Sequence, residues 1–371
     1  MNVSPSLEAP DLPRAIRQAF PMLAGCLYLD TASAGLSFAG QGAAASSFYD
    51  DAKSLGYEGR DAWREKAASV RRKLAARLGV EASDINFFGN TTEALNLVAH
   101  SIDWRPGDEV VFAADEFPSV AMAWHAAEAA GASIRPVPVA SEAEREMRLV
   151  SALTPRTRVL AVSHVHPTTG TRLDLQRLGA ACRARDVLLV VDGIQALGAV
   201  PVDLCDVDVY CSAVFKYMLS GFGLAVCSLR GRARSLLKPA FRGYANPSPS
   251  TSLQYAHVNY PGLYALDAAL TFLGETVGWG VVYRRTEALM SRLAEGLSSH
   301  GVALAAPAGA RAAIASFAVA DAEALCRRLS EQGIFVALRG GLMRASPFFY
   351  NTQDEIERFV ERIARAAGGK G

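Results

Sequence analysis

The chain has 371 residues, enough for about two domains of ordinary size and a large buried core. Half of the residues are hydrophobic and a fifth are charged, which is typical of a folded globular protein and excludes a disordered one. Lys and Arg number 38 against 37 Asp and Glu, so the net charge of +1 gives no reason to expect nucleic acid or an anionic membrane surface as a partner.

Three features narrow the class further. The uncharged stretch 243–266 is rich in Pro, Ser, Asn and Tyr, unlike the roughly 20 mainly apolar residues of a spanning helix. The first 20 residues contain no apolar signal core, so we expect a cytoplasmic protein without a membrane partner. No CxxC pair occurs, which argues against a disulfide framework or a zinc site. The six scattered cysteines are Cys26, Cys182, Cys205, Cys211, Cys227 and Cys326.

The first two thirds of the chain alternate apolar runs with amphipathic stretches. Such alternation predicts an α/β protein whose mainly parallel sheet is covered on both faces. In chain order we predict a helix at 89–99, a strand followed by a loop in 109–117, a helix at 121–131, a strand at 158–165, a helix at 173–186, and apolar strands in 187–195, 207–218 and 223–230.

A Pro- and Ser-rich loop, 241–262, precedes a smaller α+β part. We place the change of domain inside this loop, which gives a large domain of 20–250 and a small domain of 251–371 together with 1–19. After the loop we predict helices at 263–277, 283–301, 321–333 and 355–368, with short extended segments at 310–319 and 334–338.

Polar residues gather where the predicted strands end, and the active site of a parallel sheet lies at the carboxyl ends of its strands. Lys216 lies in an apolar run, where burial lowers the pKa of an amine and makes it nucleophilic. Asp192 ends a wholly apolar strand. Together they suit pyridoxal phosphate, with the lysine bonded to the cofactor and the aspartate facing the pyridine nitrogen. The alternatives are a lysine that reaches solvent from a strand edge and an aspartate that caps a turn.

Two other segments contain candidate binding residues. Thr91 and Thr92 follow a Gly-Asn turn that opens an apolar helix, and such a helix N-terminus suits a phosphate group. The alternative is an ordinary helix cap. Arg344, beyond a glycine turn in 339–352, suits a carboxylate held by two hydrogen bonds, unless it is a surface arginine.

These motifs resemble a family. The sequence is similar to fold type I pyridoxal-phosphate enzymes of aminotransferase class V, a group that includes cysteine desulfurases, isopenicillin N epimerase-like proteins and kynureninase. The resemblance covers nearly the whole chain and implies a large domain with a mainly parallel seven-stranded sheet and a smaller α+β domain. The segments that carry it are 28–35 (YLDTASAG), 90–99 (NTTEALNLVA), 116–124 (EFPSVAMAW), 190–203 (VVDGIQALGAVPVD), the Lys216 segment and 344–356 (RASPFFYNTQDEI).

The resemblance implies roles for individual residues. Lys216 forms the Schiff base with the cofactor and moves the proton at Cα of the substrate. Asp192 pairs with the pyridine nitrogen, Gln195 lies near the phenolic oxygen, and Thr91 and Thr92 lie at the phosphate.

For the substrate, the resemblance implies that Arg344 binds the α-carboxylate and that Ala32 and Ser33 line the pocket. His166 stands in place of a common Asn and is a further candidate for the pocket. Phe117 is the candidate for stacking on the cofactor ring. His164 and His166 have no evident third partner, so we expect no metal site.

The sequence also departs from the family pattern. Phe215 replaces the common His before the lysine, and Ala213 replaces a common phosphate-binding Ser, leaving Ser212 as the nearest candidate. Ala256 and His257 stand where the family commonly has a Gly-Thr pair that reaches the phosphate bound in the partner subunit, and His257 could still supply a donor or a positive charge there. The loop between the two arginine-bearing motifs contains no cysteine, and a persulfide relay needs an exposed thiolate beside the substrate. An ordinary cysteine desulfurase is therefore not expected.

The expected function is that of a pyridoxal-phosphate enzyme acting at Cα and Cβ of an amino acid, as a C–S β-elimination lyase or an aminotransferase. The alternatives are an epimerase, a non-catalytic binding protein of the same fold, and a nicotinamide-dependent enzyme, for which GFG at 221–223 is too short a fingerprint. We also predict a homodimer that shares its active site.

Overall fold

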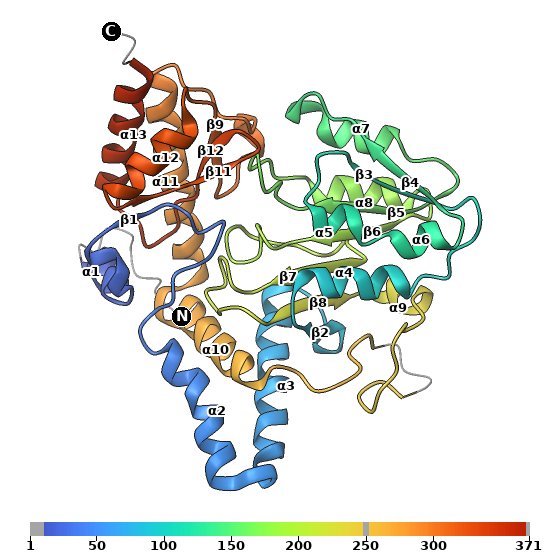
Figure 1. Ribbon diagram of the computed structural model, residues 1–371. Coiled ribbons are helices and arrows are strands. Elements are labelled where there is room, and N and C mark those ends of the chain that lie inside the picture. Colours follow the sequence, from blue (N-terminus) through green and yellow to red (C-terminus); the bar gives the residue numbers. More distant parts are fainter. Residues whose placement is uncertain (1–10, 248–251, 369–371) are drawn as a thin grey trace.

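The computed structural model describes residues 11–247 and 252–368, so 1–10 of the predicted small domain and 248–251 of the predicted loop lie outside it. Its centre is a seven-stranded sheet (Figure 1). From edge to edge the strands are β2 (Ile85–Phe88), β8 (Ala225–Leu229), β7 (Val209–Ala213), β6 (Leu188–Asp192), β5 (Thr157–Ser163), β3 (Glu109–Ala113) and β4 (Ser133–Val137).

The strand directions bring the site residues together. β7, β6, β5, β3 and β4 run parallel, whereas β8 is antiparallel to both of its neighbours. Asp192, the last residue of β6, is level with Ser163 on β5 and with Cys211 on β7. The mainly parallel sheet is therefore confirmed, and the ends of three central strands meet at one edge.

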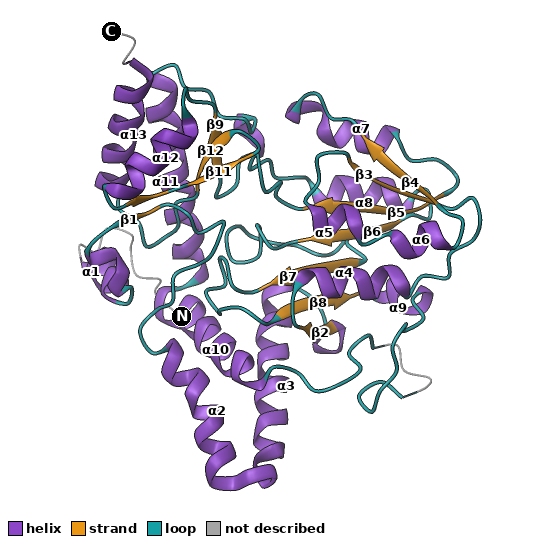
Figure 2. Ribbon diagram, viewed as in Figure 1, coloured by secondary structure: helices purple, strands orange, loops and turns teal. Residues whose placement is uncertain are grey.

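Helices cover both faces of the sheet, as Figure 2 shows. One apolar core contains residues of α3 and α8, and the core on the opposite face contains residues of α4, α5 and α6. The predicted helix 121–131 is two short helices, because the chain leaves the helical path at Trp124, whose buried indole donates to the Val120 carbonyl. The helices are α3 (Arg60–Leu78), α4 (Thr91–His100), α5 (Pro118–Met122), α6 (His125–Ala129), α7 (Arg145–Ser151), α8 (Leu175–Arg183) and α9 (Gly231–Leu236).

A helical hairpin that was not predicted from the sequence projects from the body (Figure 1). It consists of α2 (Gln41–Leu55) and α3, and α10 (Tyr260–Thr271) packs against both. Asp267 on α10 accepts from Lys66 and Lys73 on α3 at 2.7 and 2.6 Å. These contacts attach the chain after the loop to the N-terminal hairpin.

The remaining elements form the smaller α+β part. The three-stranded sheet has the order β11 (Ala337–Arg339), β12 (Leu342–Ala345), β9 (Ala315–Phe317). β1 (Leu27–Tyr28) pairs with β10 (Ile334–Phe335), so an N-terminal segment joins this part. The boundary between the two domains at 250 and 251 stays a prediction. The helices are α1 (Asp11–Gln18), α11 (Trp279–Ser299), α12 (Ala322–Glu331) and α13 (Gln353–Gly368).

In the described part of the chain no single helix has the length and apolarity to cross a membrane. One pair, Tyr260–Val277 and Trp279–Ser299, meets these criteria only when taken together and is bent by 79°. The apolar side chains of this pair, among them Leu263, Leu266 and Leu293, are buried in the protein core.

Candidate active site

A cavity of about 160 Å³ lies at the carboxyl ends of β5, β6 and β7. Six of the site residues predicted from the sequence line it: Thr91, Thr92, Phe117, Asp192, Gln195 and Lys216. The other lining residues are Asn90, Ser119, Ser163, Val165, Pro167, Ile194, Ala213 and Phe215.

Among the described residues, Lys216 and Asp192 are the only titratable ones that line this cavity. Burial raises the pKa of Asp192 to about 6, although the Ile194 backbone N–H donates to this carboxylate at 3.0 Å. Burial also lowers the pKa of Lys216 to about 8, and the charge of Asp192 opposes this shift. Within the described residues the Lys216 amine has no hydrogen bond and no ion pair within 4 Å, so it is available for chemistry.

The lowered pKa of Lys216 gives a testable pH dependence. An amine attacks an aldehyde only in its neutral form, so the rate of covalent attachment of pyridoxal phosphate to the cofactor-free protein should rise with pH through about 8 and then level off. An ordinary lysine, with a pKa of about 10.4, would continue to gain rate up to about pH 10. Borohydride trapping over this pH range measures the rate. A steady climb between about pH 9 and about pH 10 would contradict the prediction.

The N-terminus of α4 forms one end of the cavity. Asn90 caps the helix, because its short side chain reaches the Glu93 backbone N–H and accepts from it at 2.8 Å. The Thr92 and Ser119 hydroxyls lie 2.7 Å apart, whereas the Thr91 hydroxyl accepts from the Ala213 N–H at 2.8 Å. Hydroxyls and backbone N–H groups at the positive end of a helix make a site for an anion.

Gln195 connects the cavity to the residues predicted to bind substrate. Its side-chain amide donates to the Ala32 carbonyl at 3.1 Å, while its buried Oε1 has no partner in the described part of the chain. Ser33 accepts from the Arg344 guanidinium at 2.7 Å. Arg344 is buried, which lowers its pKa, and it also donates to the Pro167 carbonyl at 3.0 Å. Arg344 does not line the cavity, but it is bonded to Pro167, which does.

Besides Arg344, Ala32 and Ser33, three more of the predicted site residues do not line the cavity. The Ser212 hydroxyl is buried and donates to the Ala213 carbonyl at 2.9 Å. Both ring nitrogens of His166 have partners, Asp115 and Thr169, outside the cavity. His257 lies against Tyr244 and Tyr260 and lines a separate cavity. Roles for these three residues stay predictions.

Aromatic side chains flank the lysine. The Phe215 ring lies 5.6 Å from the Lys216 amine and stacks on Phe222 at 4.4 Å. Phe117 also lines the cavity and is 45% exposed. Ser119 and Ser163 also line the cavity but were not among the site residues predicted from the sequence, although Ser119 lies in the family-like segment 116–124.

Gly35 is packed against the turn that carries Lys216. Its N–H donates to the Phe215 carbonyl at 2.9 Å, and a Cβ at Gly35 would lie 2.0 Å from the Lys216 carbonyl oxygen. We expect Gly35→Ala to lower the free energy of unfolding by about 1–3 kcal/mol, as overpacking does, and to weaken cofactor binding. Urea unfolding and cofactor titration measure the two effects. Gly25→Ala is the control, because nothing lies within 4 Å of its Cβ position, and equal behaviour of the two variants would contradict the prediction.

Comparison with known proteins identifies the family and supports the fold. The sequence matches the family Aminotransferase class-V over residues 27–359. Isopenicillin N epimerase of Amycolatopsis lactamdurans is 29% identical over 80% of this chain and 83% of its own length. A probable cysteine desulfurase of Xylella fastidiosa (strain Temecula1) is 26% identical over 84% and 82%. The cystine C–S lyase C-DES has a TM-score of 0.86 at 23% identity over 94% and 100%, which confirms the fold type I architecture.

Enzymes of aminotransferase class V use pyridoxal phosphate, so the cofactor predicted from the sequence is confirmed. The cavity fits this group chemically. Lys216 has a free amine for its aldehyde, and the N-terminus of α4 offers donors for its phosphate. The buried Asp192 carboxylate suits a protonated ring nitrogen, and Gln195, with its unpartnered Oε1, offers an amide to the ring oxygen.

Proposed function

Since the chain belongs to the aminotransferase class V family, we propose that it is a pyridoxal-phosphate-dependent lyase that eliminates a sulfur substituent from Cβ of an amino acid. The observation that carries this proposal is that, in the part of the chain that the structure describes, the titratable residues lining the cavity are Lys216 and Asp192 alone. Asp192 is assigned to the cofactor ring. Lys216 is then the single group that moves protons at the substrate.

Bound pyridoxal phosphate supplies an electron-withdrawing ring that acidifies the Cα–H bond of an attached amino acid. Lys216, whose pKa of about 8 leaves part of the amine neutral near pH 7, takes the Cα proton and returns it to the departing sulfur. Arg344 orients the substrate carboxylate. Phe117 and Phe215, which line the cavity, limit the access of water to the substrate.

The names of the relatives support sulfur as the atom that leaves Cβ, and the positions of the cysteines support elimination as the way it leaves. Relatives named probable cysteine desulfurase are about a quarter identical to this chain. A desulfurase that works by a persulfide relay needs a reactive thiolate at the site. None of the cysteines lines the cavity, and burial raises the pKa of the partly buried Cys326 and Cys26. Cleavage of a C–S bond without a thiol nucleophile is elimination, in which the sulfur leaves as a thiol.

An epimerase is the second candidate, because isopenicillin N epimerases are 28–29% identical to this chain. Epimerisation by two bases requires a second acid on the opposite face of Cα. The described cavity offers only Lys216 for this purpose, which favours elimination.

The proposal is tested with a panel of amino acids and S-substituted cysteines. Elimination converts an S-substituted cysteine and water into pyruvate, ammonia and a thiol in equal amounts, without an amino acceptor. Keto-acid-dependent turnover would instead show an aminotransferase, and loss of optical activity without these products would show an epimerase. Either result would overturn the lyase proposal.

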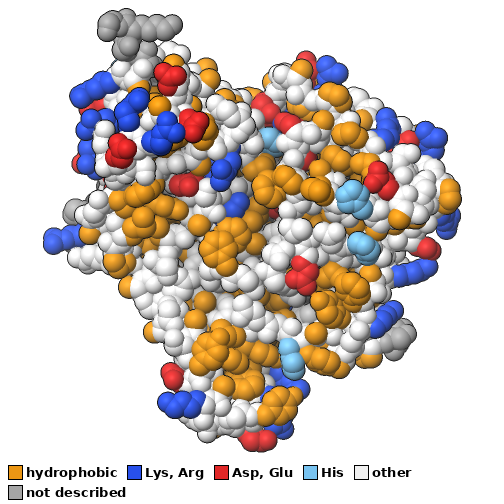
Figure 3. All heavy atoms as spheres, in the orientation of Figure 1, with side chains coloured by type: hydrophobic (Ala, Val, Ile, Leu, Met, Phe, Trp, Pro, Cys, Tyr) orange, Lys and Arg blue, Asp and Glu red, His pale blue; other side chains and the backbone are white. Residues whose placement is uncertain are grey.

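We also propose that two copies of the chain form a dimer with a shared active site. Hydrophobic side chains form patches on the surface in Figure 3. Two exposed aromatic residues, Phe222 and Tyr244, contact predicted or lining residues of the site. Phe222, which stacks on Phe215, is 72% exposed, and Tyr244 beside His257 is 65% exposed. A second copy would cover these rings, since large exposed apolar patches mark interaction sites.

Sedimentation should therefore give a dimer, and the double variant Phe222→Ser, Tyr244→Ser should dissociate at a protein concentration at least about tenfold higher than wild type. Leu236→Ser, at an exposed site on α9, is the control. A monomeric wild-type protein with full cofactor affinity and activity would contradict the prediction.

A further inference from the structure

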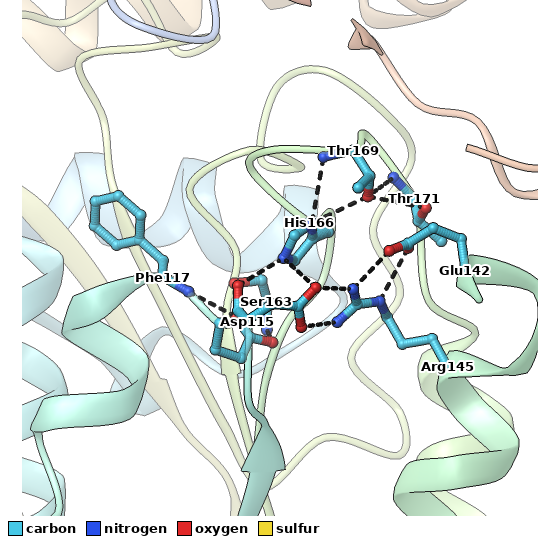
Figure 4. A network of polar contacts seen from close by, with 9 residues as sticks. Asp115, Phe117, Glu142, Arg145, Ser163, His166, Thr169 and Thr171 are labelled. Atoms are coloured by element: carbon cyan, nitrogen blue, oxygen red, sulfur yellow. Dashed lines mark hydrogen bonds and ion pairs between the residues drawn. The ribbon is translucent and has the colours of Figure 1, made fainter. Parts of the chain in front are cut away.

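A buried arginine outside the cavity is bonded to the loops that form its walls. Arg145, at the start of α7, is 1% exposed. Its guanidinium donates to both oxygens of Asp115, at 2.9 and 2.6 Å, and to both oxygens of Glu142, at 3.0 and 2.6 Å. Together with His166 these residues form what we call the Arg145 network (Figure 4).

The Arg145 network has the side-chain types of a metal site, since atoms of Asp115, Glu142 and His166 lie within 4.8 Å of one another. The guanidinium, however, already binds both carboxylates. Burial raises the pKa values of Asp115 and Glu142, but hydrogen bonds from Arg145 outweigh it and hold both below their usual range. The bonds to Glu142 and Asp115 likewise outweigh burial and raise the pKa of Arg145. The cluster is thus an ion-pair network around a fixed cation.

His166 connects this network to a second loop. Its Nδ1 lies 3.2 Å from the Thr169 backbone nitrogen, whose N–H can only donate, so Nδ1 accepts. The proton of the neutral ring is then on Nε2, which donates to the Asp115 carbonyl at 3.0 Å. The loop after β3 and the loop after β5 are therefore bonded to each other at this point.

Both loops continue directly to the cavity. Glu116 follows Asp115 and accepts from the Ser163 N–H and hydroxyl, at 2.9 and 2.6 Å. Phe117 comes next and lines the cavity. On the other loop, Pro167 follows His166, lines the cavity, and accepts from Arg344 through its carbonyl.

We propose that Arg145 is a positioning residue, which acts through Asp115 and His166 to hold Phe117 and Pro167 against the bound cofactor and substrate. This inference rests on the proposed function, because it assigns Phe117 and Pro167 to that site. The planar guanidinium of Arg145 bonds each carboxylate with two N–H groups, which fixes the orientation of the carboxylate as well as its distance. A single point charge fixes only the distance. Removing the guanidinium frees two walls of the cavity, although no atom of Arg145 lines it.

The test compares Arg145→Gln, Arg145→Lys and Asp115→Asn with the wild-type protein. Arg148→Gln is the matched control, because Arg148 lies on the same helix and its guanidinium forms an exposed ion pair with Glu144. Three quantities are measured: the dissociation constant of pyridoxal phosphate, hydrogen exchange along the chain, and kcat and KM separately.

We expect Arg145→Gln to bind the cofactor at least about tenfold more weakly and to lower kcat about tenfold to a hundredfold, as misplaced site residues do. Exchange should become faster in 114–117 and 164–170 but not in β6. Arg145→Lys should lie between wild type and Arg145→Gln, and Arg148→Gln should match wild type.

A folded Arg145→Gln variant with wild-type cofactor affinity and loop exchange would overturn the inference. Faster exchange over the whole chain with unchanged affinity would also overturn it, because that indicates a general structural role. If Arg145→Gln does not fold, Asp115→Asn is judged by the same criteria. Failure of the wild-type protein to bind the cofactor would instead refute the proposed function, and loop exchange would still report on the network.

Discussion

Replacing Lys216 by alanine is expected to lower kcat/KM by at least about 10³-fold, because the variant loses the amine that both bonds the cofactor and acts as the base beside the substrate. Non-covalent cofactor binding should persist, since the N-terminus of α4 and Asp192 remain. Borohydride should then attach no cofactor to the protein, and mass spectrometry after reduction measures this directly.

Lys53→Ala is the control for this variant, because Lys53 is exposed on α2, away from the cavity. It should keep wild-type activity and covalent attachment. Cofactor found on another lysine, or turnover by Lys216→Ala within tenfold of wild type, would remove the basis for the proposed mechanism.

Replacing Asp192 by asparagine is expected to lower kcat/KM by about 10²–10³-fold, because an amide does not keep the cofactor ring nitrogen protonated. The variant should also shift the titration of Lys216. The charge of Asp192 raises the pKa of Lys216, so its removal should move the midpoint of covalent attachment below about 8. The pH dependence of borohydride trapping measures this shift.

Asp61→Asn is the control for the charge change, because Asp61 is exposed on α3 and forms an exposed ion pair with Arg64. It should move neither the rate nor the midpoint. An Asp192→Asn variant whose midpoint rises would show that the two groups do not interact as their positions indicate.

Local patterns in the sequence determined the centre of the site. The apolar run before Asp192 forms β6, and all five residues of β6 are buried. Parallel strands end at the same edge, so a residue that ends β6 and a lysine three residues beyond β7 lie close together. The Gly-Asn-Thr-Thr turn opens α4 as predicted. These features depend on residues adjacent in sequence and on the direction of neighbouring strands, and both can be read from one sequence.

Tertiary structure alone decided what surrounds this centre. Arg344 meets Ser33 across 311 residues, and Arg145 meets Asp115 across 30. His166 follows a strand that ends at the cavity, yet its ring faces Asp115 and Thr169. The break at Trp124 and the hairpin of α2 and α3 likewise depend on packing. Such contacts depend on how loops that are distant in sequence pack against each other. A local pattern of residues does not indicate which distant side chain a given residue will contact.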